Sequence, residues 1–354
     1  MILTDQGVTR VESEIPPGWT DFVAASDGAT IYHDAAWLEV IARTYGFQPR
    51  VFTLTNGSGE IGAILPTFLV TSRLTGRRLI SLPYTNAAGP LHRPGVDDTP
   101  LLDAAIELAR KEACRYVEVR GQPGQDTTYP EFERSSYFES FLLNLEPGRD
   151  PVRASFDKRA RRGIARSIKS GVAVRFGADL DAVRAFYQLN LLTRRKHGVP
   201  PQPFTFFQLL WEALRPRGAI EILLAELDRR VVAGMVLLVH RDRVTYAYGA
   251  SDQRYLRYAP NHALFDAAIG WSIERGFRSF DFGRTSPDNP GLLEFKRQWG
   301  ARRLSLPYYY WPRRDGFVGA GENGLKYRCF TALWRRLPLG ATSILGPALY
   351  RNLA

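Results

Sequence analysis

The segment with the clearest chemical potential runs from residue 281 to residue 300 and combines an acid, a glycine turn and a lysine. The sequence DFGRT at 281–285 predicts a strand that ends in a turn, which places Arg284 on a loop, where functional residues often lie. FKRQWG at 295–300 sets Lys296 among aromatic residues, where a lysine can bind a phosphate or stabilise the oxyanion of an acyl transfer. The alternative is a structural lysine in a salt bridge with Asp281 or Glu294.

A second candidate is a basic run between Arg153 and Lys169, in which seven basic residues accompany one acid, Asp157. A helix over this run would bring four of them within about 80° of one another, at about 100° per residue: Arg159, Arg162, Arg166 and Lys169. Such a stripe suits bidentate contacts with phosphates and leaves Ile164 and Ile168 on the opposite side. The alternative is a solvated helix face.

A third candidate lies where Tyr246, Tyr248 and Tyr258 precede a predicted helix that opens with Asn261 and His262. The N-terminus of a helix presents free N–H groups to an anion, and His262 could accept a proton. We therefore expect Tyr248, Asn261 and His262 to contact a substrate. The alternative for His262 is a histidine that is merely packed or exposed.

Other catalytic signatures are missing from the sequence. It contains no Walker-type phosphate loop, no Gly-x-Ser-x-Gly elbow and no His-Glu-x-x-His motif. Cys114 and Cys329 are the only cysteines and lie far apart, which gives neither a disulfide framework nor a metal-ligand spacing. We expect no metal site and no tightly bound cofactor.

The first half reads as mixed α/β. A helix is predicted at 34–45, with Gly46 ending it, and another at 103–114. Strands are predicted at 50–55 and 61–70, and the turn NGSG at 56–59 indicates a hairpin between them. Shorter strands are expected at 79–83 and around residues 117–119.

The second half follows a break at 145–151, where EPGRDP suits a turn or linker. Helices are predicted at 156–170, 179–197, 204–215 and 261–275, and strands at 220–227, 231–240, 244–249, 279–282 and 304–311. We expect a first domain over 1–150, a second over 151–312, and a helical tail over 313–354 that packs back on the first domain.

Composition favours a soluble protein with phosphate-bearing partners. The 354 residues are 45% hydrophobic and 23% charged, with a net charge of +11, which suits nucleic acid, anionic lipid surfaces or phosphorylated small molecules. The chain starts without a secretion-signal pattern, and its apolar stretches fall short of the ~20 residues of a membrane-spanning helix. We expect a cytoplasmic protein, with peripheral contact at the inner face of the membrane as a further expectation.

Several segments then match one family in their order and spacing. They are YHDAAWL at 32–38, GAILP at 62–66, SLPY at 81–84, GP at 89–90, RARRGIARSIKSG at 159–171, TRRKHGVP at 193–200, and the DFGRT and FKRQWG segments. Together they cover roughly residues 20–312 and resemble the FemAB family and its BioF2-like acetyltransferase relatives. The resemblance is greatest to relatives found with bacterial exopolysaccharide and exosortase systems.

The resemblance implies an α/β (α+β) fold of two tandem GNAT-like domains, each a mixed, mostly antiparallel sheet flanked by helices. It implies transfer of an acyl or aminoacyl group to an amine of a phosphate-containing peptidoglycan or exopolysaccharide precursor that is linked to a nucleotide or lipid. Phe295 and Lys296 resemble a pair that the family ties to the reacting carbonyl, and Arg162 or Arg166 resembles its phosphate-binding arginine. Trp37 is a further candidate for substrate contact.

Two hypotheses remain. In the first, the acceptor amine attacks the donor ester or thioester, Asp281 or the substrate takes the proton, and Lys296 stabilises the oxyanion. The donor, acyl-CoA or aminoacyl-tRNA, stays open: RYAPN at 257–261 departs from a GNAT pyrophosphate loop, and no coiled-coil arm for tRNA is present. In the second, the chain binds anionic membranes or nucleic acid without catalysis, supported by Arg335 and Arg336 beside Trp334.

Overall fold

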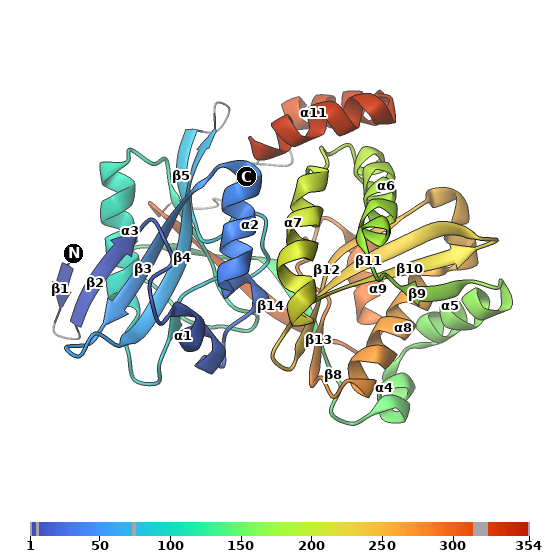
Figure 1. Cartoon of the computed structure of the whole chain (residues 1–354), viewed down its shortest axis with the longest axis horizontal. Coiled ribbons are helices and arrows are strands. Elements are labelled where there is room, and N and C mark those ends of the chain that lie inside the picture. The colour runs from blue at the N-terminus through green and yellow to red at the C-terminus, as the bar shows by residue number, and fades with distance from the viewer. Residues whose placement is uncertain (1, 5–6, 73–75, 314–324, 353–354) are drawn as a thin grey trace. The chain divides into compact units, whose positions relative to one another are not determined.

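The computed structural model describes residues 2–4, 7–72, 76–313 and 325–352, and the chain forms two compact units (Figure 1). Unit 1 comprises Met1–Glu139, Ser305–Gly319 and Arg351–Ala354; unit 2 comprises Ser140–Leu304 and Ala320–Tyr350. The first division therefore falls inside a strand, earlier than the proline-rich break on which the sequence-based boundary rested. The helices of the tail group with unit 2, whereas we expected them on the first domain.

Unit 1 is built on a sheet in which β1 to β5 form an antiparallel meander. β7 pairs with β5 in parallel and with β14 antiparallel, β8 follows β14, and β6 lies beside β4. The bounds are β1 Ile2–Thr4, β2 Gly7–Glu12, β3 Gln48–Thr55, β4 Ile61–Ser72, β5 Gly76–Ile80, β6 Leu91–His92, β7 Val117–Arg120, β8 Glu133–Asn144 and β14 Arg302–Trp311. The predicted hairpin joins β3 to β4: Asn56 Oδ1 accepts from the N–H groups of Ser58 and Glu60.

The helices of unit 1 are α1 Trp19–Ala25, the 3-10 turn η1 Ile31–His33, α2 Ala35–Tyr45 and α3 Thr99–Lys111. α2 agrees with its prediction, because the Asp34 side chain accepts from Ala36 N–H and Gly46 ends the helix with a φ of 65°. α3 buries Leu101, Ala105 and other small apolar residues against the sheet. It begins earlier than expected because its first turn carries threonine and proline rather than an apolar repeat.

Unit 2 is built on a second run of strands, in the order β8-β13-β12-β11-β10-β9. The pairs are antiparallel except β12 with β13, which is parallel. The new bounds are β9 Ala173–Phe176, β10 Ile220–Leu227, β11 Arg230–His240, β12 Arg243–Ser251 and β13 Ser279–Asp281. Strands β8 and β14 each begin in one unit and end in the other, so the chain passes between the units within strands.

Two helical layers cover the strands of unit 2. One holds α6 Leu180–His197 and α7 Phe204–Leu214; the other holds α8 Pro260–Glu274, against which α5 Lys158–Lys169 packs. The remaining helices are α4 Arg149–Ser155, α9 Pro290–Arg297, α10 Leu325–Arg336 and α11 Leu339–Arg351, with the 3-10 turns η2 Arg215–Arg217 and η3 Gln253–Tyr258. The single helix expected at 156–170 begins instead at Lys158, because Asp157 is its N-cap and accepts from two backbone N–H groups.

Candidate active site

Asp281 closes β13, and its carboxylate is fixed at the start of the following turn. Oδ1 accepts hydrogen bonds from Ser140 Oγ at 2.9 Å and from Gly283 N–H at 2.8 Å. The turn needs a left-handed residue, and Gly283 has a φ of 70°, which glycine adopts without strain. The carboxylate is therefore held in one orientation just beneath the surface, with Oδ1 occupied by two donors.

Lys296 lies on α9 with its side chain only 2% exposed. Its Nζ donates to Gly283 O at 2.8 Å and to Arg284 O at 3.3 Å, so the amine is held against the same turn as Asp281. Burial lowers the pKa of Lys296 to about 7, although Asp281 opposes the shift; Arg284 adds to it. An amine with this pKa exists in both protonation states near neutral pH, and can therefore both donate to an oxyanion and accept a proton.

Phe295 points away from that turn, because neighbouring helix positions lie about 100° apart around the axis. Its ring centroid lies 5.3 Å from that of His262, 5.3 Å from that of Phe265 and 6.0 Å from that of Trp299. The rings of Phe265 and Trp299 belong to the hydrophobic core of unit 2, and Phe295 packs against that core. Phe295 thus anchors α9 to α8, while its neighbour Lys296 carries the polar contact.

His262 sits in the first turn of α8, where α5 crosses at close range. A Cβ atom added to Gly163 would lie 2.1 Å from His262 Cδ2, so the approach of α5 depends on glycine. Burial is the main cause that lowers the pKa of His262, and the nearby charge of Arg166 adds to it. The histidine is therefore predominantly neutral near pH 7, with its ring 5.9 Å from that of Trp299.

The predicted basic stripe is present on the exposed side of α5, where Arg159, Arg162 and Arg166 all face solvent. Arg159 forms an ion pair with Glu294 of α9, to which Arg297 also pairs at 2.9 Å. This ties the stripe to the helix that carries Lys296. Ile164 is buried as expected, but Ile168 is 69% exposed because α5 packs on α8 through the face formed by Ala160, Gly163 and Ser167.

The comparisons with known proteins bear on this unit most directly. Residues 154–297 match the family model described as an acetyltransferase (GNAT) domain, and this span includes α5, α8, Asp281 and Lys296. A lipid II:glycine glycyltransferase of Staphylococcus saprophyticus is 22% identical over 372 aligned positions, covering 79% of this chain and 87% of that protein. One of Staphylococcus aureus is 20% identical with the same coverage. The protein is an acyltransferase that matches the GNAT domain over residues 154–297.

Solved structures agree with the fold of this acyltransferase. FemX superposes with a TM-score of 0.63 at 15% identity, covering 85% of this chain and 96% of that one. L-PGS from Bacillus licheniformis superposes with a TM-score of 0.58 at 13% identity, covering 92% of this chain and 99% of that one. A tandem GNAT protein from the clavulanic acid biosynthesis pathway superposes with a TM-score of 0.52 at 13% identity, covering 83% of this chain and 93% of that one. The resemblance to FemAB-like transferases and the α/β fold of GNAT-like halves are confirmed.

Two residues of the acyltransferase with a predicted substrate contact pack against aromatic side chains. Trp37 is completely buried in α2 of unit 1, with its ring 4.9 Å from that of Tyr32, so the side chain fills the core. Tyr248 packs on Phe207 of α7, whereas Tyr246 packs on Phe265 of α8. A β-bulge separates the two tyrosines, because Val236 pairs with Tyr248 but the next residue of β11 pairs with Tyr246. The bulge places them on opposite faces, and Tyr248 does not join Asn261 and His262.

Two contributors to the site were not predicted: Ser140 orients Asp281, and Gly163 leaves room for the ring of His262. Thr285, which the sequence places on the loop with Arg284, is buried beside the turn that binds Lys296. Thr285 Oγ1 has no hydrogen-bond partner among the residues that the structure describes. A glycine in the middle of a predicted helix is the one signal that the sequence offered, since glycine there is costly and usually marks a close approach.

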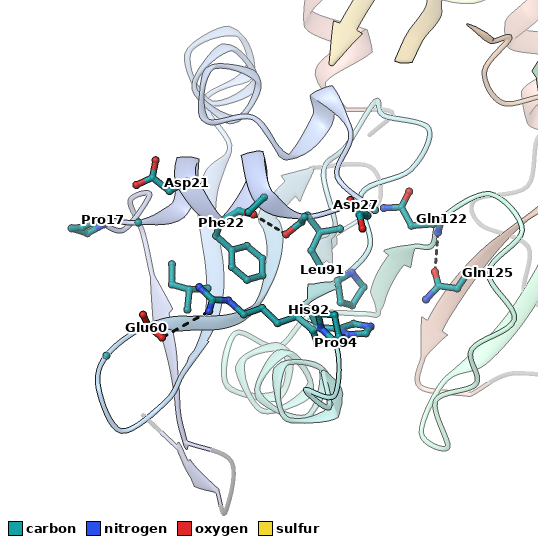
Figure 2. A pocket seen from close by; sticks show the side chains of 18 residues that line it. Pro17, Asp21, Phe22, Asp27, Glu60, Leu91, His92, Pro94, Gln122 and Gln125 are labelled. Atoms are coloured by element: carbon teal, nitrogen blue, oxygen red, sulfur yellow. Dashed lines mark hydrogen bonds and ion pairs between the residues drawn. The ribbon is translucent and has the colours of Figure 1, made fainter. Parts of the chain in front are cut away.

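The structure also holds two cavities of about 800 Å³. The first lies in unit 1, between α1 and the strands β4 and β6, with Phe22 and Leu91 flanked by the acids Asp21, Asp27 and Glu60 (Figure 2). The second lies in unit 2 and is largely basic. Neither is lined by Lys296. Among the described residues, no group of three or more His, Cys, Asp or Glu side chains is placed to hold a metal ion.

Proposed function

We propose that this acyltransferase moves an acyl or aminoacyl group onto an amine of a phosphate-containing cell-envelope precursor. The observation that carries the proposal is the buried Lys296 of α9, whose pKa is about 7 and whose amine binds the same turn that orients Asp281. Relatives that cover most of the chain are lipid II:glycine glycyltransferases, which supports an aminoacyl group and a lipid-linked acceptor.

In the proposed reaction, the acceptor amine attacks the carbonyl of the donor, and the leaving group departs from a tetrahedral intermediate. Lys296, when protonated, stabilises the oxyanion, and the buried hydroxyl of Thr285 is a candidate second donor. Asp281, through Oδ2, or neutral Lys296 takes the proton that the amine loses. Because Nζ is bound to Gly283 O and Arg284 O, this role requires the turn to shift when substrate binds.

The acceptor's phosphates are proposed to bind the exposed face of α5. Arg162 and Arg166 point to solvent, and their guanidinium groups can bind phosphate oxygens in a bidentate manner. Arg284, exposed on the turn, and Asn261, at the start of α8, complete the proposed contacts. The ion pair between Arg159 and Glu294 would then couple acceptor binding to α9 and Lys296.

The donor is proposed to be an activated aminoacyl ester, as on tRNA, in preference to acyl-CoA. In the segment nearest to a GNAT pyrophosphate loop, α8 begins with Pro260 after the left-handed Ala259, and none of the described side chains caps the helix. Proline has no backbone N–H, so this helix start offers an anion fewer donors than a glycine-rich loop would. We propose that the reaction takes place in the cytoplasm. Separately, none of the described helices is both long and apolar enough to cross a membrane.

The test is to supply the purified protein with acyl-CoA and aminoacyl-tRNA pools separately. Acceptors are amino-sugar and peptide-bearing nucleotide or lipid pyrophosphates, with products detected by mass spectrometry. A product from aminoacyl-tRNA supports the proposal in full, and one from acyl-CoA would replace the donor. Lys296→Met should abolish turnover while the circular dichroism spectrum stays unchanged. Full activity of that variant would remove Lys296 from the mechanism.

A further inference from the structure

The outer face of α11 exposes aliphatic side chains to solvent. Ile344 is 77% exposed and Leu345 is 50% exposed. Ala348 is also exposed, and at about 100° per residue these three side chains cover one continuous arc of the helix. Exposed aliphatic residues scattered singly are ordinary, but a contiguous group marks a surface that meets another apolar phase.

The orientation of α11 is set by its opposite face. A Cβ atom added to Gly346 would lie 2.4 Å from Pro201 Cδ, so this side of the helix abuts the loop between α6 and α7. The guanidinium carbon of Arg194 lies 5.3 Å from the ring centroid of Tyr350. In Figure 1, α11 (red) runs beyond the ends of α6 and α7. The aliphatic arc therefore faces outward because the other face is occupied.

The neighbouring helix α10 contributes Leu333, which is 64% exposed, and two exposed arginines, Arg335 and Arg336. Trp334, which the sequence suggested as the residue at a membrane surface, is instead buried. Its ring stacks on that of Phe330 at 5.6 Å. Among the described side chains of this helix pair, the large apolar ones that are exposed are Leu333, Ile344 and Leu345.

The chain segment that carries these residues is strongly basic. The sequence 325–352 holds five basic residues and no acid: Lys326, Arg328, Arg335, Arg336 and Arg351. The second cavity lies at the junction of α10 and α11 and is lined by Arg195, Lys196, Arg254, Arg335 and others. Asp252 pairs with Arg254, but Arg195, Lys196 and Arg335 form no ion pair within the part of the chain that the structure describes. The cluster therefore keeps its charge for an external anion.

We propose that the α10–α11 surface docks on an anionic phospholipid bilayer, with Leu333, Ile344 and Leu345 in the interface and the flanking arginines on lipid phosphates. Charge complementarity selects this partner, because an apolar helix face bordered by cations lies stably in the headgroup region of anionic membranes. The inference rests on the proposed function and deepens it, since docking places the transferase beside a lipid-linked acceptor.

The test is co-sedimentation of the full chain with vesicles of phosphatidylcholine alone or with 30% phosphatidylglycerol, without substrates. The anionic vesicles should bind, and the double variant Ile344→Gln/Leu345→Gln should bind at least about tenfold more weakly, from the lost apolar contact. Ile168→Gln is the matched control, because it removes an equally exposed aliphatic residue from α5. A loss in the control but not in the double variant would move the contact to α5 and overturn the proposal.

A second arm separates charge from apolar contact and from other occupants. Arg335→Gln should weaken binding to anionic vesicles about fivefold, from the ~1 kcal/mol per basic residue near such a surface. Binding that depends on the arginine but not on Ile344 and Leu345 would show a polyanion site instead. A dimer in analytical ultracentrifugation that the double variant abolishes would assign the surface to a second copy. Because vesicle binding is measured without turnover, its failure would leave the proposed transfer reaction standing.

Discussion

Lys296→Met offers the sharpest test of the site, because the structure predicts how the effect on stability changes with pH. The folded protein holds Lys296 with a pKa of about 7, against an ordinary value of 10.5. At pH values between these two pKa values, Lys296 is protonated more fully in the unfolded chain than in the folded one, so the free energy of unfolding rises with pH. For this pair of pKa values, the free energy of unfolding should increase by about 2 kcal/mol from pH 7 to pH 9.

Methionine has a similar length and does not titrate, so the variant should lack this increase. At pH 7 the substitution removes the cost of burying an ammonium group, roughly 4 kcal/mol for the same pKa values. It also leaves two carbonyls without their donor, at about 1–3 kcal/mol each. The two effects nearly cancel, and the variant should lie within about 2 kcal/mol of the wild type at pH 7 and fall behind by a further ~2 kcal/mol at pH 9.

The assay is urea unfolding at pH 7, 8 and 9, followed by tryptophan fluorescence. Lys111→Met, on the exposed side of α3, is the control and should keep the pH dependence of the wild type. Subtracting the free energy of unfolding of the variant from that of the wild type at each pH cancels the contribution of every other titrating group. If the free energies of unfolding of the wild type and of Lys296→Met rise in parallel with pH, Lys296 titrates normally. Both its role as a proton acceptor and the reasoning from its burial then fail.

Three further outcomes are expected. Gly163→Ala should destabilise the fold by about 1–2 kcal/mol despite alanine's better helix propensity, because its Cβ would overlap the ring of His262. Combining it with His262→Ala should recover part of this loss, and additive effects of the two substitutions on the free energy of unfolding would contradict the overlap. Asp157→Ala should cost about 1 kcal/mol through the lost N-cap of α5, with Asp157→Asn close to wild type; equal losses would show that the cap is not responsible. Arg166→Gln should raise the KM for a phosphate-bearing acceptor about tenfold at unchanged stability, with Arg161→Gln as control; equal effects would mean a diffuse charge effect.

Much of unit 2 could be predicted because its signals are local. Asp179 and Gly198 bound α6 as cap and stop, and the strands β10, β11 and β12 lie within about one or two residues of the predicted ranges. The sequence placed Asp281 and Lys296 in one segment, the resemblance pointed to Phe295 and Lys296, and the structure brings Asp281 and Lys296 to one turn. Their catalytic role is untested and remains a prediction.

The features of the site that could not be predicted depend on three-dimensional geometry, which the spacing of residues in the sequence does not reveal. Tyr246 and Tyr248 have the spacing of residues on one strand face, and only the pairing with β11 reveals the bulge that separates them. Trp37 lies in a matching motif, but its complete burial follows from packing across unit 1. Ser140 reaches Asp281 from 141 residues away in the chain, so no local pattern could have paired them.

The passage of the chain through β8 and β14 has a consequence for how the protein emerges from the ribosome. β14 lies between β7 and β8 in unit 1, yet it follows almost all of unit 2 in the chain. During synthesis, the sheet of unit 1 keeps a gap beside β7 until residue 311 has left the exit tunnel, whereas strands β9 to β13 of unit 2 can pair earlier. A nascent chain stalled before β14 should therefore protect residues of β10 to β12 from protease while β7 remains susceptible. The sheet of unit 1 would therefore be completed only after the strands of unit 2 have been made.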